Sequence, residues 1–191
     1  MVTLKERQHQ VREDAIIEAM HHLLLKKGYP ATSMDDVAAE VGIGKATLYL
    51  HFKSKKELVL KVIARNLEEA EAQIWLIDPS LPAIERIRRA LENGIRHRVS
   101  MGSTQIGLLP EEIHGDPAFQ EAERRAHASV EKLIREAQQG GVVRTDIAPP
   151  VIREFIVSIF DMNFEGLIQN GAAIDDLVEP LVDMIMRAIC P

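Results

Sequence analysis

Apolar side chains recur at intervals of three and four residues along nearly the whole chain. This spacing places them on one face of an α-helix. In the first segment Val11, Ala15, Ala19 and Leu23 follow one another four residues apart. A strict alternation of apolar and polar positions, which would indicate half-buried strands, does not recur. The pattern therefore predicts an all-α protein.

Glycine and proline divide this pattern into about nine helices, because glycine adopts the left-handed conformation that ends a helix and proline interrupts or starts one. We expect breaks at Gly28, Gly42, Asp78-Pro79, Asp116-Pro117, Gly140-Gly141, Pro149-Pro150 and Asn170-Gly171. The helix that starts at Pro149-Pro150 is predicted to run through Phe164, and the last helix spans residues 174–189. Residues 102–116 are expected to be a looser stretch.

Residues 32–53 contain two short helices joined by a tight turn. Thr32 and Ser33 are N-cap candidates for the first helix, and Gly42 suits the turn. This build indicates a helix-turn-helix, in which the second short helix projects into the major groove of DNA. The packing that holds it there is expected from Val37, Ala38, Val41, Ile43, Leu48 and Phe52.

The outward positions of the second short helix carry side chains suited to DNA. They are Lys45, Ala46, Thr47, Tyr49, Leu50 and His51. Lysine and threonine bind base edges or phosphates, and a tyrosine hydroxyl donates to phosphate. Lys55 follows at the start of the next helix, whose N-terminus Ser54 and Glu57 can cap.

Charge is distributed unevenly along the chain. The formal net charge is −6, but residues 1–60 hold nine lysines and arginines against eight acids, which leaves −7 for the remainder. Residues 45–56 contain four lysines and no acid. An acidic body with one basic stretch fits a protein that contacts phosphates at one place, although a solvated lysine face is the simpler interpretation.

The bulk properties exclude several other classes. The 191 residues suffice for one large domain or a small domain fused to a larger one. No apolar run is long enough to cross a bilayer, and the polar first 14 residues lack the apolar core of a signal peptide. The single cysteine, Cys190, cannot form an internal disulfide. We therefore expect a cytoplasmic location.

The stretch GYPATSMDDVAAEVGIGKATLYLHFKSKKEL, residues 28–58, resembles the signature of the TetR family of transcriptional regulators. The shared features are Gly28-Tyr29, Thr32-Ser33, Val37-Ala38, Gly42-Ile43, Leu48-Tyr49, His51-Phe52 and Lys55 to Leu58. The segment GVVRTDIAPPVI, residues 141–152, resembles the family's entry into its dimerisation helices. The resemblance implies a helix-turn-helix domain over residues 1–54 and a ligand-binding and dimerisation domain over residues 55–191.

The resemblance also implies roles for single residues. Lys45, Ala46 and Thr47 match positions that face bases, whereas Tyr49, His51, Lys55, Thr32 and Ser33 match positions that hold phosphates. Two residues depart from the family pattern. Gly44 replaces the usual serine or threonine before the recognition helix and is a weaker cap. Ala46 replaces a frequent glycine, and its methyl group could contact a thymine methyl.

For the body, the resemblance implies a ligand pocket in the fourth to seventh helices and a dimer built from the last two helices. Residues 150–164 are apolar nearly all round, which requires burial by the chain itself and by a partner. The pocket is expected to include Trp75, Met101, Leu108, Phe119, Phe155, Phe160 and Met162. The dimer interface is expected to include Ile152, Ile156, Ile159, Leu177, Leu181, Met184 and Ile185.

The expected function is a repressor that binds a palindromic operator as a homodimer and is released by a small hydrophobic effector. Two alternatives compete. An enzyme or a metal sensor could use Glu111, Glu112 and His114 with His97 and His127, but no metalloenzyme, phosphate-loop or nucleophile motif is present. We therefore expect no catalytic activity and no cofactor. A helical interaction module or an activator is the second alternative.

Overall fold

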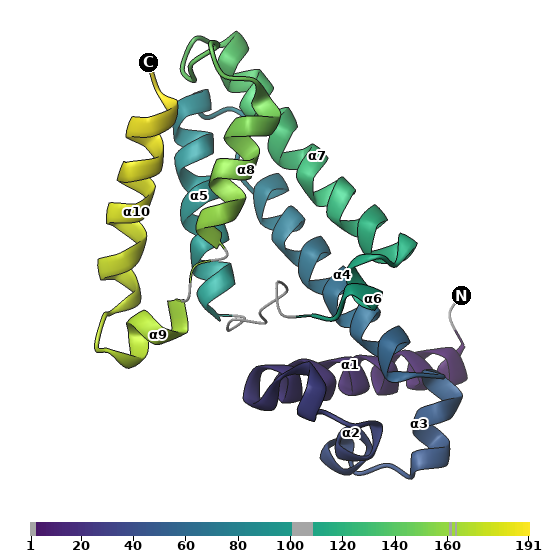
Figure 1. Cartoon of the computed structure of the whole chain (residues 1–191). Coiled ribbons are helices and arrows are strands. Elements are labelled where there is room, and N and C mark those ends of the chain that lie inside the picture. Colours follow the sequence, from purple (N-terminus) through teal and green to yellow (C-terminus); the bar gives the residue numbers. More distant parts are fainter. Residues whose placement is uncertain (1–2, 101–108, 161, 163) are drawn as a thin grey trace. The chain divides into compact units, whose positions relative to one another are not determined.

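The computed structural model describes residues 3–100, 109–160, 162 and 164–191, and this part of the chain is built from α-helices without a strand (Figure 1). The helices are α1 Leu4–Ala31, α2 Met34–Val41, α3 Lys45–His51, α4 Lys55–Trp75, α5 Ala83–Ser100, α6 Glu111–His114, α7 Pro117–Gln139, α8 Pro149–Phe160, α9 Phe164–Gln169 and α10 Ile174–Ile189. The predicted all-α class is confirmed.

The described residues form two compact units. The first contains residues up to Asn66 together with 109–120, and the second contains residues from Leu67 to 100 together with those from Glu121 onward. The division falls inside α4, because the first turns of that helix bury Leu58, Val59 and Val62. The functional boundary expected between residues 54 and 55 stays a prediction.

The local signals in the first unit act as expected. Gly28 has a φ of 76° and interrupts the helical conformation near the end of α1. Ser33 caps α2 in a capping box with Asp36, and Gly42 ends that helix with a φ of 73°. The Glu57 N–H donates to Ser54 Oγ at 3.1 Å at the start of α4. These short-range bonds fix where each helix starts and stops.

The core of the first unit joins its four main helices. Ile16 and Met20 of α1, Val37 of α2, Leu48 of α3 and Leu58 of α4 are fully buried. Burying a side chain of this size stabilises the fold by roughly 1.5–3 kcal/mol. Leu48 therefore anchors the short helix α3, which is too short to be stable alone.

The second unit has its own core. Helix α5 lies beside α8 and α10 (Figure 1). Its buried side chains are Ile87, Leu91, Ile95, Ile134, Ala137, Val143, Ile152, Ile156, Phe164, Val178, Val182, Ile185, Met186 and Ile189. They come from five helices and the α7–α8 connector, so this unit packs as one hydrophobic body.

Two elements differ from the prediction. Residues 111–114 form the single turn α6, which is too short to show a periodic pattern. Helix α8 ends at Phe160 instead of continuing through Phe164, which begins α9. At the end of α8, the Phe160 carbonyl accepts a hydrogen bond from Nε of Arg98 in α5 at 2.8 Å. Among the described residues, no helix is both long enough and apolar enough to cross a membrane.

Candidate DNA-binding interface

Helix α3 is anchored on one side and open on the other. Leu48 is completely buried, whereas Tyr49 is 41% and Leu50 83% exposed. Lys45 and Ala46 are also exposed, and Thr47 is half-buried. On α3 the expected packing residue Leu48 is thus buried, and most of the expected outward positions are exposed. His51, also expected to face outward, is the exception. This geometry is what a recognition helix requires, because its exposed side must enter a groove.

The turn before α3 is held by the backbone. Gly42 adopts the left-handed conformation, and the Ile43 N–H donates to Ala38 O at 3.0 Å. Gly44 is the N-cap residue of α3 and offers no side-chain cap, as its lack of a hydroxyl requires. Its carbonyl instead accepts the Thr47 and Leu48 N–H groups at 2.9 and 3.1 Å. The turn therefore sets the angle between α2 and α3 without side-chain capping.

Lys45 is held by an acidic neighbour. Its Nζ lies 2.7 Å from Asp35 Oδ1 in the first turn of α2. The hydrogen bond and charge of Asp35 raise the pKa of Lys45, so its ammonium group stays protonated. Both side chains are solvent-exposed. Exposed ion pairs are weak, so the lysine is free to exchange Asp35 for a DNA phosphate or base.

Three of the predicted phosphate contacts have partners within the first unit. Thr32 is buried, and its hydroxyl donates to Gly28 O at 2.8 Å and to Leu23 O at 3.3 Å. Lys55 Nζ donates to Tyr29 O and lies 3.9 Å from the centre of the Tyr29 ring. Partial burial lowers the pKa of Lys55. The Ser33 hydroxyl is exposed but donates to Asp36 Oδ2 at 2.6 Å.

His51, the fourth of these residues, also turns inward. Its side chain is only 5% exposed. Its ring lies against His9 of α1, with 4.3 Å between the ring centroids. Its Nδ1 atom is buried without a hydrogen-bond partner. His51 therefore does not present its ring on the same side as Tyr49 and Leu50.

The first unit also includes α6 and the start of α7. The Tyr29 hydroxyl donates to Glu112 at 3.1 Å, and burial together with Glu112 raises the pKa of Tyr29. Lys56 Nζ lies 2.7 Å from Asp116, whose pKa this lysine lowers. Glu112 of α6 thus contacts the end of α1, and Asp116, which follows α6, contacts the start of α4. The Glu111–His114 pair expected as a possible metal site does not form a three-ligand group among the described residues.

The predicted pocket residues are not gathered into one described cavity. Phe119 is buried in the first unit with its ring edge-on to His114, 5.1 Å away. Phe155, Phe160 and Met162 belong to the second unit, and Phe160 packs against α5. Trp75 is exposed, and its indole N–H donates to Glu71. Met101 and Leu108 lie outside the described residues.

The predicted dimer residues divide into two groups. Ile152, Ile156 and Ile185 are buried in the chain's own core, and Ile159, Leu177 and Leu181 are partly buried against it. Met184 is 66% exposed. The neighbouring positions Val151 and Phe155, one residue before the predicted ones, are exposed instead. Because adjacent helix positions point about 100° apart, the outward face of α8 lies one residue away from the predicted one.

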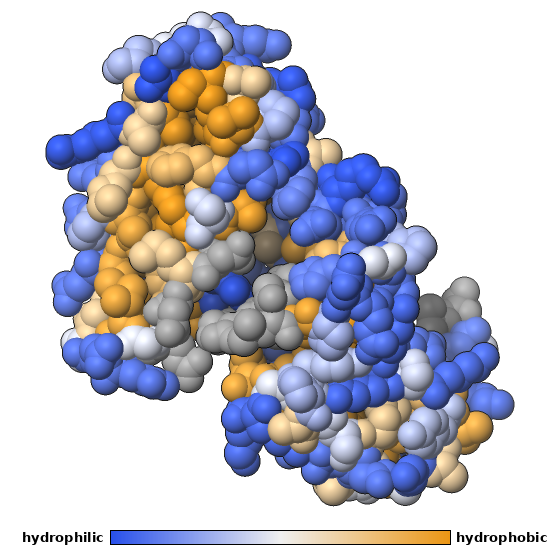
Figure 2. Space-filling view, viewed as in Figure 1, coloured by the Kyte–Doolittle hydropathy of each residue, from blue (hydrophilic) through white to orange (hydrophobic). Residues whose placement is uncertain are grey.

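Apolar side chains gather on one face of the second unit (Figure 2). The exposed large apolar side chains of this unit include Val151 and Phe155 of α8 and Met184 of α10. The sequence pattern could have indicated Val151 and Phe155, since they are spaced four apart, but an all-round apolar helix hides which face is outward. His9 and Glu13 of α1 were missed entirely, although their spacing of four also places them on one face.

Comparison with known proteins gives a consistent result. The model of the bacterial regulatory proteins of the tetR family matches residues 16–62. The uncharacterized HTH-type transcriptional regulator YhgD of Bacillus subtilis is 31% identical over 150 residues, which are 76% of this chain and 78% of that protein. The HTH-type transcriptional repressor DhaR of a Mycobacterium species is 26% identical over 150 residues, 75% of each chain.

Solved structures share the fold. The transcriptional regulator FadR from Bacillus subtilis, in complex with stearoyl-CoA, superposes with a TM-score of 0.77 at 16% identity, covering 92% of this chain and 98% of that one. The segment that the family model matches contains the helix-turn-helix described above. In its helix α3, Leu48 is buried, whereas Lys45 and Tyr49 are exposed. The chain therefore belongs to the TetR family of transcriptional regulators.

Proposed function

We propose that this chain is a transcriptional repressor that binds a palindromic operator as a homodimer and leaves it when a small hydrophobic effector binds the second unit. The observation that carries the proposal is the exposure pattern of α3. Its Leu48 is fully buried while Lys45, Ala46, Tyr49 and Leu50 face solvent. A short rigid helix with this pattern fits the major groove.

The proposed contacts follow from which side chains are accessible. Lys45, Ala46 and Thr47, at the start of α3, would face base edges, where lysine donates and the alanine methyl touches thymine. Tyr49 and Ser33 would donate to phosphates. Thr32 and His51 have buried side chains, and the ammonium group of Lys55 donates to Tyr29 O, so we assign these three residues the role of positioning α2, α3 and α4.

A homodimer would cover the apolar face of the second unit. Val151 and Phe155 of α8 and Met184 of α10 are exposed, and Leu177 and Leu181 of α10 are partly exposed. Two symmetric copies would bury this face against itself. A two-fold dimer also presents two recognition helices, which suits half-sites about 34–36 Å apart.

An apolar effector is supported by two observations. The core of the second unit consists of packed aliphatic and aromatic side chains, with Phe164 buried in it and Phe160 packed against it. FadR from Bacillus subtilis, which shares this fold, has been solved with stearoyl-CoA. Release from DNA requires an effector that prefers a dimer geometry unsuited to the operator. Coupling free energies of this kind are typically about 1–3 kcal/mol.

Selection of genomic DNA fragments by the purified protein, followed by footprinting, tests the proposal. We expect a palindromic site protected by the wild-type chain. Lys45→Ala and Thr47→Ala should change the preferred bases, and Tyr49→Phe should weaken binding to all DNA sequences about equally. Lys61→Ala, which removes an exposed lysine of α4 away from α3, is the matched control.

Transcription in vitro from the selected promoter then distinguishes repression from activation. A repressor lowers transcript yield in proportion to operator occupancy. If the protein binds no duplex, or if the α3 variants leave both affinity and base preference unchanged, the placement of the recognition helix is wrong. If it binds but raises transcription, the chain is an activator.

A further inference from the structure

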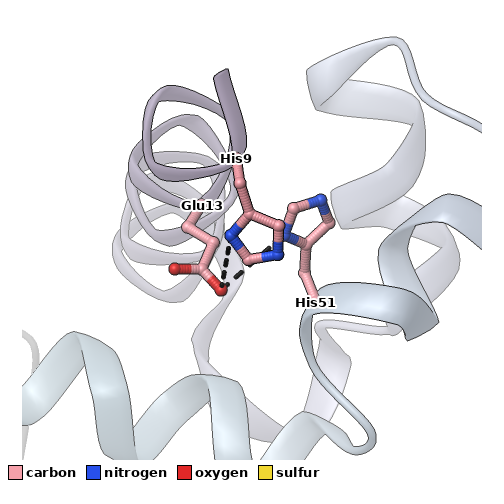
Figure 3. Close-up of side chains that lie close together, drawn as sticks. All are labelled: His9, Glu13 and His51. Atoms are coloured by element: carbon pink, nitrogen blue, oxygen red, sulfur yellow. Dashed lines mark ion pairs between the residues drawn. The ribbon is translucent and has the colours of Figure 1, made fainter. Parts of the chain in front are cut away.

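Two imidazoles and a carboxylate converge where α1 passes the end of α3 (Figure 3). His9 and Glu13 lie one turn apart on α1, and His51 is the last residue of α3. Of the three, only His51 was considered for the DNA-binding role proposed above, and its ring points away from the exposed side of α3. The group therefore calls for its own explanation.

The distances show convergence without hydrogen bonding. Glu13 Oε1 lies 3.6 Å from His9 Nδ1 and 3.7 Å from His51 Nδ1. Both separations exceed the range of an N–H···O hydrogen bond. One carboxylate oxygen thus faces two ring nitrogens at nearly equal distances (Figure 3).

Burial makes this arrangement unusual. The His51 side chain is 5% exposed, and its Nδ1 has no hydrogen-bond partner. Buried polar atoms in native proteins nearly always have a partner, so an unpaired one needs an explanation such as an ion. Glu13 is partly exposed and His9 is exposed. The group is therefore closed on the His51 side and open to solvent on the His9 side.

The donor set selects a class of ligand. Two imidazole nitrogens with one carboxylate oxygen suit Zn²⁺ and neighbouring divalent transition metals, whereas Mg²⁺ and Ca²⁺ prefer oxygen ligands alone. Bonds of about 2.1 Å in a tetrahedral site place ligand atoms about 3.4 Å apart. The two observed separations are only slightly longer, and all three candidate atoms lie within 4.8 Å of one another.

We propose that His9, Glu13 and His51 form a site for one Zn²⁺ ion, with water completing the coordination. The exposed His9 ring has the freedom to close the remaining distance. The ion gives His51 Nδ1 the partner that it lacks and links α1 to the C-terminal end of α3. The site does not depend on the repressor function proposed above, since metal binding is measured without DNA.

The experiment uses the full chain without an affinity tag, treated with a chelator and then dialysed into metal-free buffer. Zn²⁺ titration by calorimetry should give one ion per chain, and Co²⁺ should give visible absorption bands of a low-symmetry site. Binding to the folded state alone raises the melting temperature, and Zn²⁺ at a hundred times Kd should raise it by about 5–10 °C. Affinity should fall at low pH, since protons compete for the imidazoles.

His9→Gln, Glu13→Gln and His51→Gln should each weaken Zn²⁺ binding about tenfold or more, because even the loss of an outer-shell partner has an effect of that size. His22→Gln is the matched control. It removes another α1 histidine, whose Nδ1 lies 2.7 Å from Glu40, and leaves the three proposed ligands intact. Because His9 is exposed, His9→Gln keeps the test valid if the buried His51 variant unfolds.

The proposal is overturned by any of three results. The chelator-treated chain could bind no Zn²⁺ at micromolar concentration, which would leave the three groups as an ion-pairing cluster. Zn²⁺ binding could survive in the His9 and Glu13 variants. It could also be lost equally in His22→Gln, which would place the ion elsewhere on α1.

Discussion

At the scale of single residues, the first unit separates side chains that hold the helices from side chains that remain free for DNA. Thr32 and Tyr49 illustrate the contrast. Thr32 is buried with its hydroxyl bonded to two carbonyls, whereas Tyr49 is partly exposed on α3. The family pattern assigns a phosphate contact to both positions, but burial and hydrogen bonding give them different physical roles.

Thr32→Val should lower the free energy of unfolding by about 1–2 kcal/mol, because it removes a buried hydroxyl from two acceptors while keeping the shape. Thr32→Ser should retain most of that stability. Operator affinity, measured well below the melting temperature, should change less than about twofold in both variants. Urea unfolding and gel shifts check this. A large affinity loss in a fully folded Thr32→Val chain would mean that Thr32 contacts phosphate directly.

Asp36 provides a prediction on acid stability. Hydrogen bonds from Lys27 and Ser33 lower the pKa of its carboxyl group well below the ordinary aspartate value of 3.8. A carboxyl group whose pKa is lower in the folded than in the unfolded state stabilises the folded protein at any pH above the unfolded-state pKa. This stabilisation is lost as the pH falls toward the folded-state pKa. Asp36→Asn should therefore melt below the wild type at pH 5–7, and the difference should narrow below about pH 3.8.

Melting curves between pH 3 and pH 7 check this narrowing. Asp14→Asn is a suitable control, because the Asp14 carboxylate accepts from the neutral Gln10 amide. Its melting temperature should follow that of the wild type across the range. A difference between Asp36→Asn and the wild type that stays constant down to pH 3 would contradict the assigned role of Lys27 and Ser33.

At the scale of elements, the sequence predicts those helix boundaries that neighbouring residues in the chain determine. It does not predict boundaries that depend on packing between distant segments. Gly28 interrupts the helical conformation of α1, and Ser33 and Gly42 start and end α2 as expected, because capping depends on neighbours in the chain. The end of α8 at Phe160 could not be predicted, since Arg98 of α5 binds the Phe160 carbonyl from 62 residues away. The inward turn of His51 likewise depends on His9 of α1.

Gly94 of α5 marks such a long-range contact. A Cβ atom added there would lie 2.8 Å from Phe160 Cζ. Gly94→Ala gains about 1 kcal/mol of helix propensity but overpacks the contact, which typically costs about 1–3 kcal/mol. We expect net destabilisation of up to about 2 kcal/mol. In a Phe160→Leu background the smaller side chain leaves space for the added methyl group. Gly94→Ala should then stabilise the protein by up to about 1 kcal/mol.

Urea unfolding of the four chains in this cycle gives the coupling free energy between the two positions. A value above about 1 kcal/mol supports close packing of α5 against α8. Additive effects would show that the Phe160 ring moves aside without cost. The exposed side of α8 is unaffected by this cycle, so dimer formation serves as an internal check on the fold.

At the scale of the whole molecule, the exposed apolar side chains of α8 and α10 are the feature that a monomer leaves unexplained. Sequence alone predicted that these helices meet a partner, and it identified Met184 as outward. It placed Ile152, Ile156 and Ile185 in the interface as well, whereas these side chains fill the core of the second unit. In a helix that is apolar on all sides, the sequence does not distinguish the side that packs in the chain's own core from the side that packs against a partner.

Met184→Glu tests the proposed dimer. Met184 is 66% exposed in one chain, so the substitution leaves the chain's own core intact. In a dimer it would bury two unpaired carboxylates, and an uncompensated buried charge costs about 3–5 kcal/mol. The molar mass measured by light scattering should therefore fall from twice the 21.4 kDa chain mass toward the mass of one chain. Leu76→Glu, at an exposed apolar residue outside α8 and α10, should leave the dimer unchanged.

The same substitution should affect DNA binding through assembly alone. A monomer presents one α3 to one half-site, so it loses the second set of groove and phosphate contacts that a dimer makes on a palindrome. Met184→Glu should thus bind the full operator no more tightly than an isolated half-site, although every α3 residue is intact. A variant that stays monomeric yet binds the palindrome like the wild type would show that α8 and α10 do not set the spacing of the recognition helices.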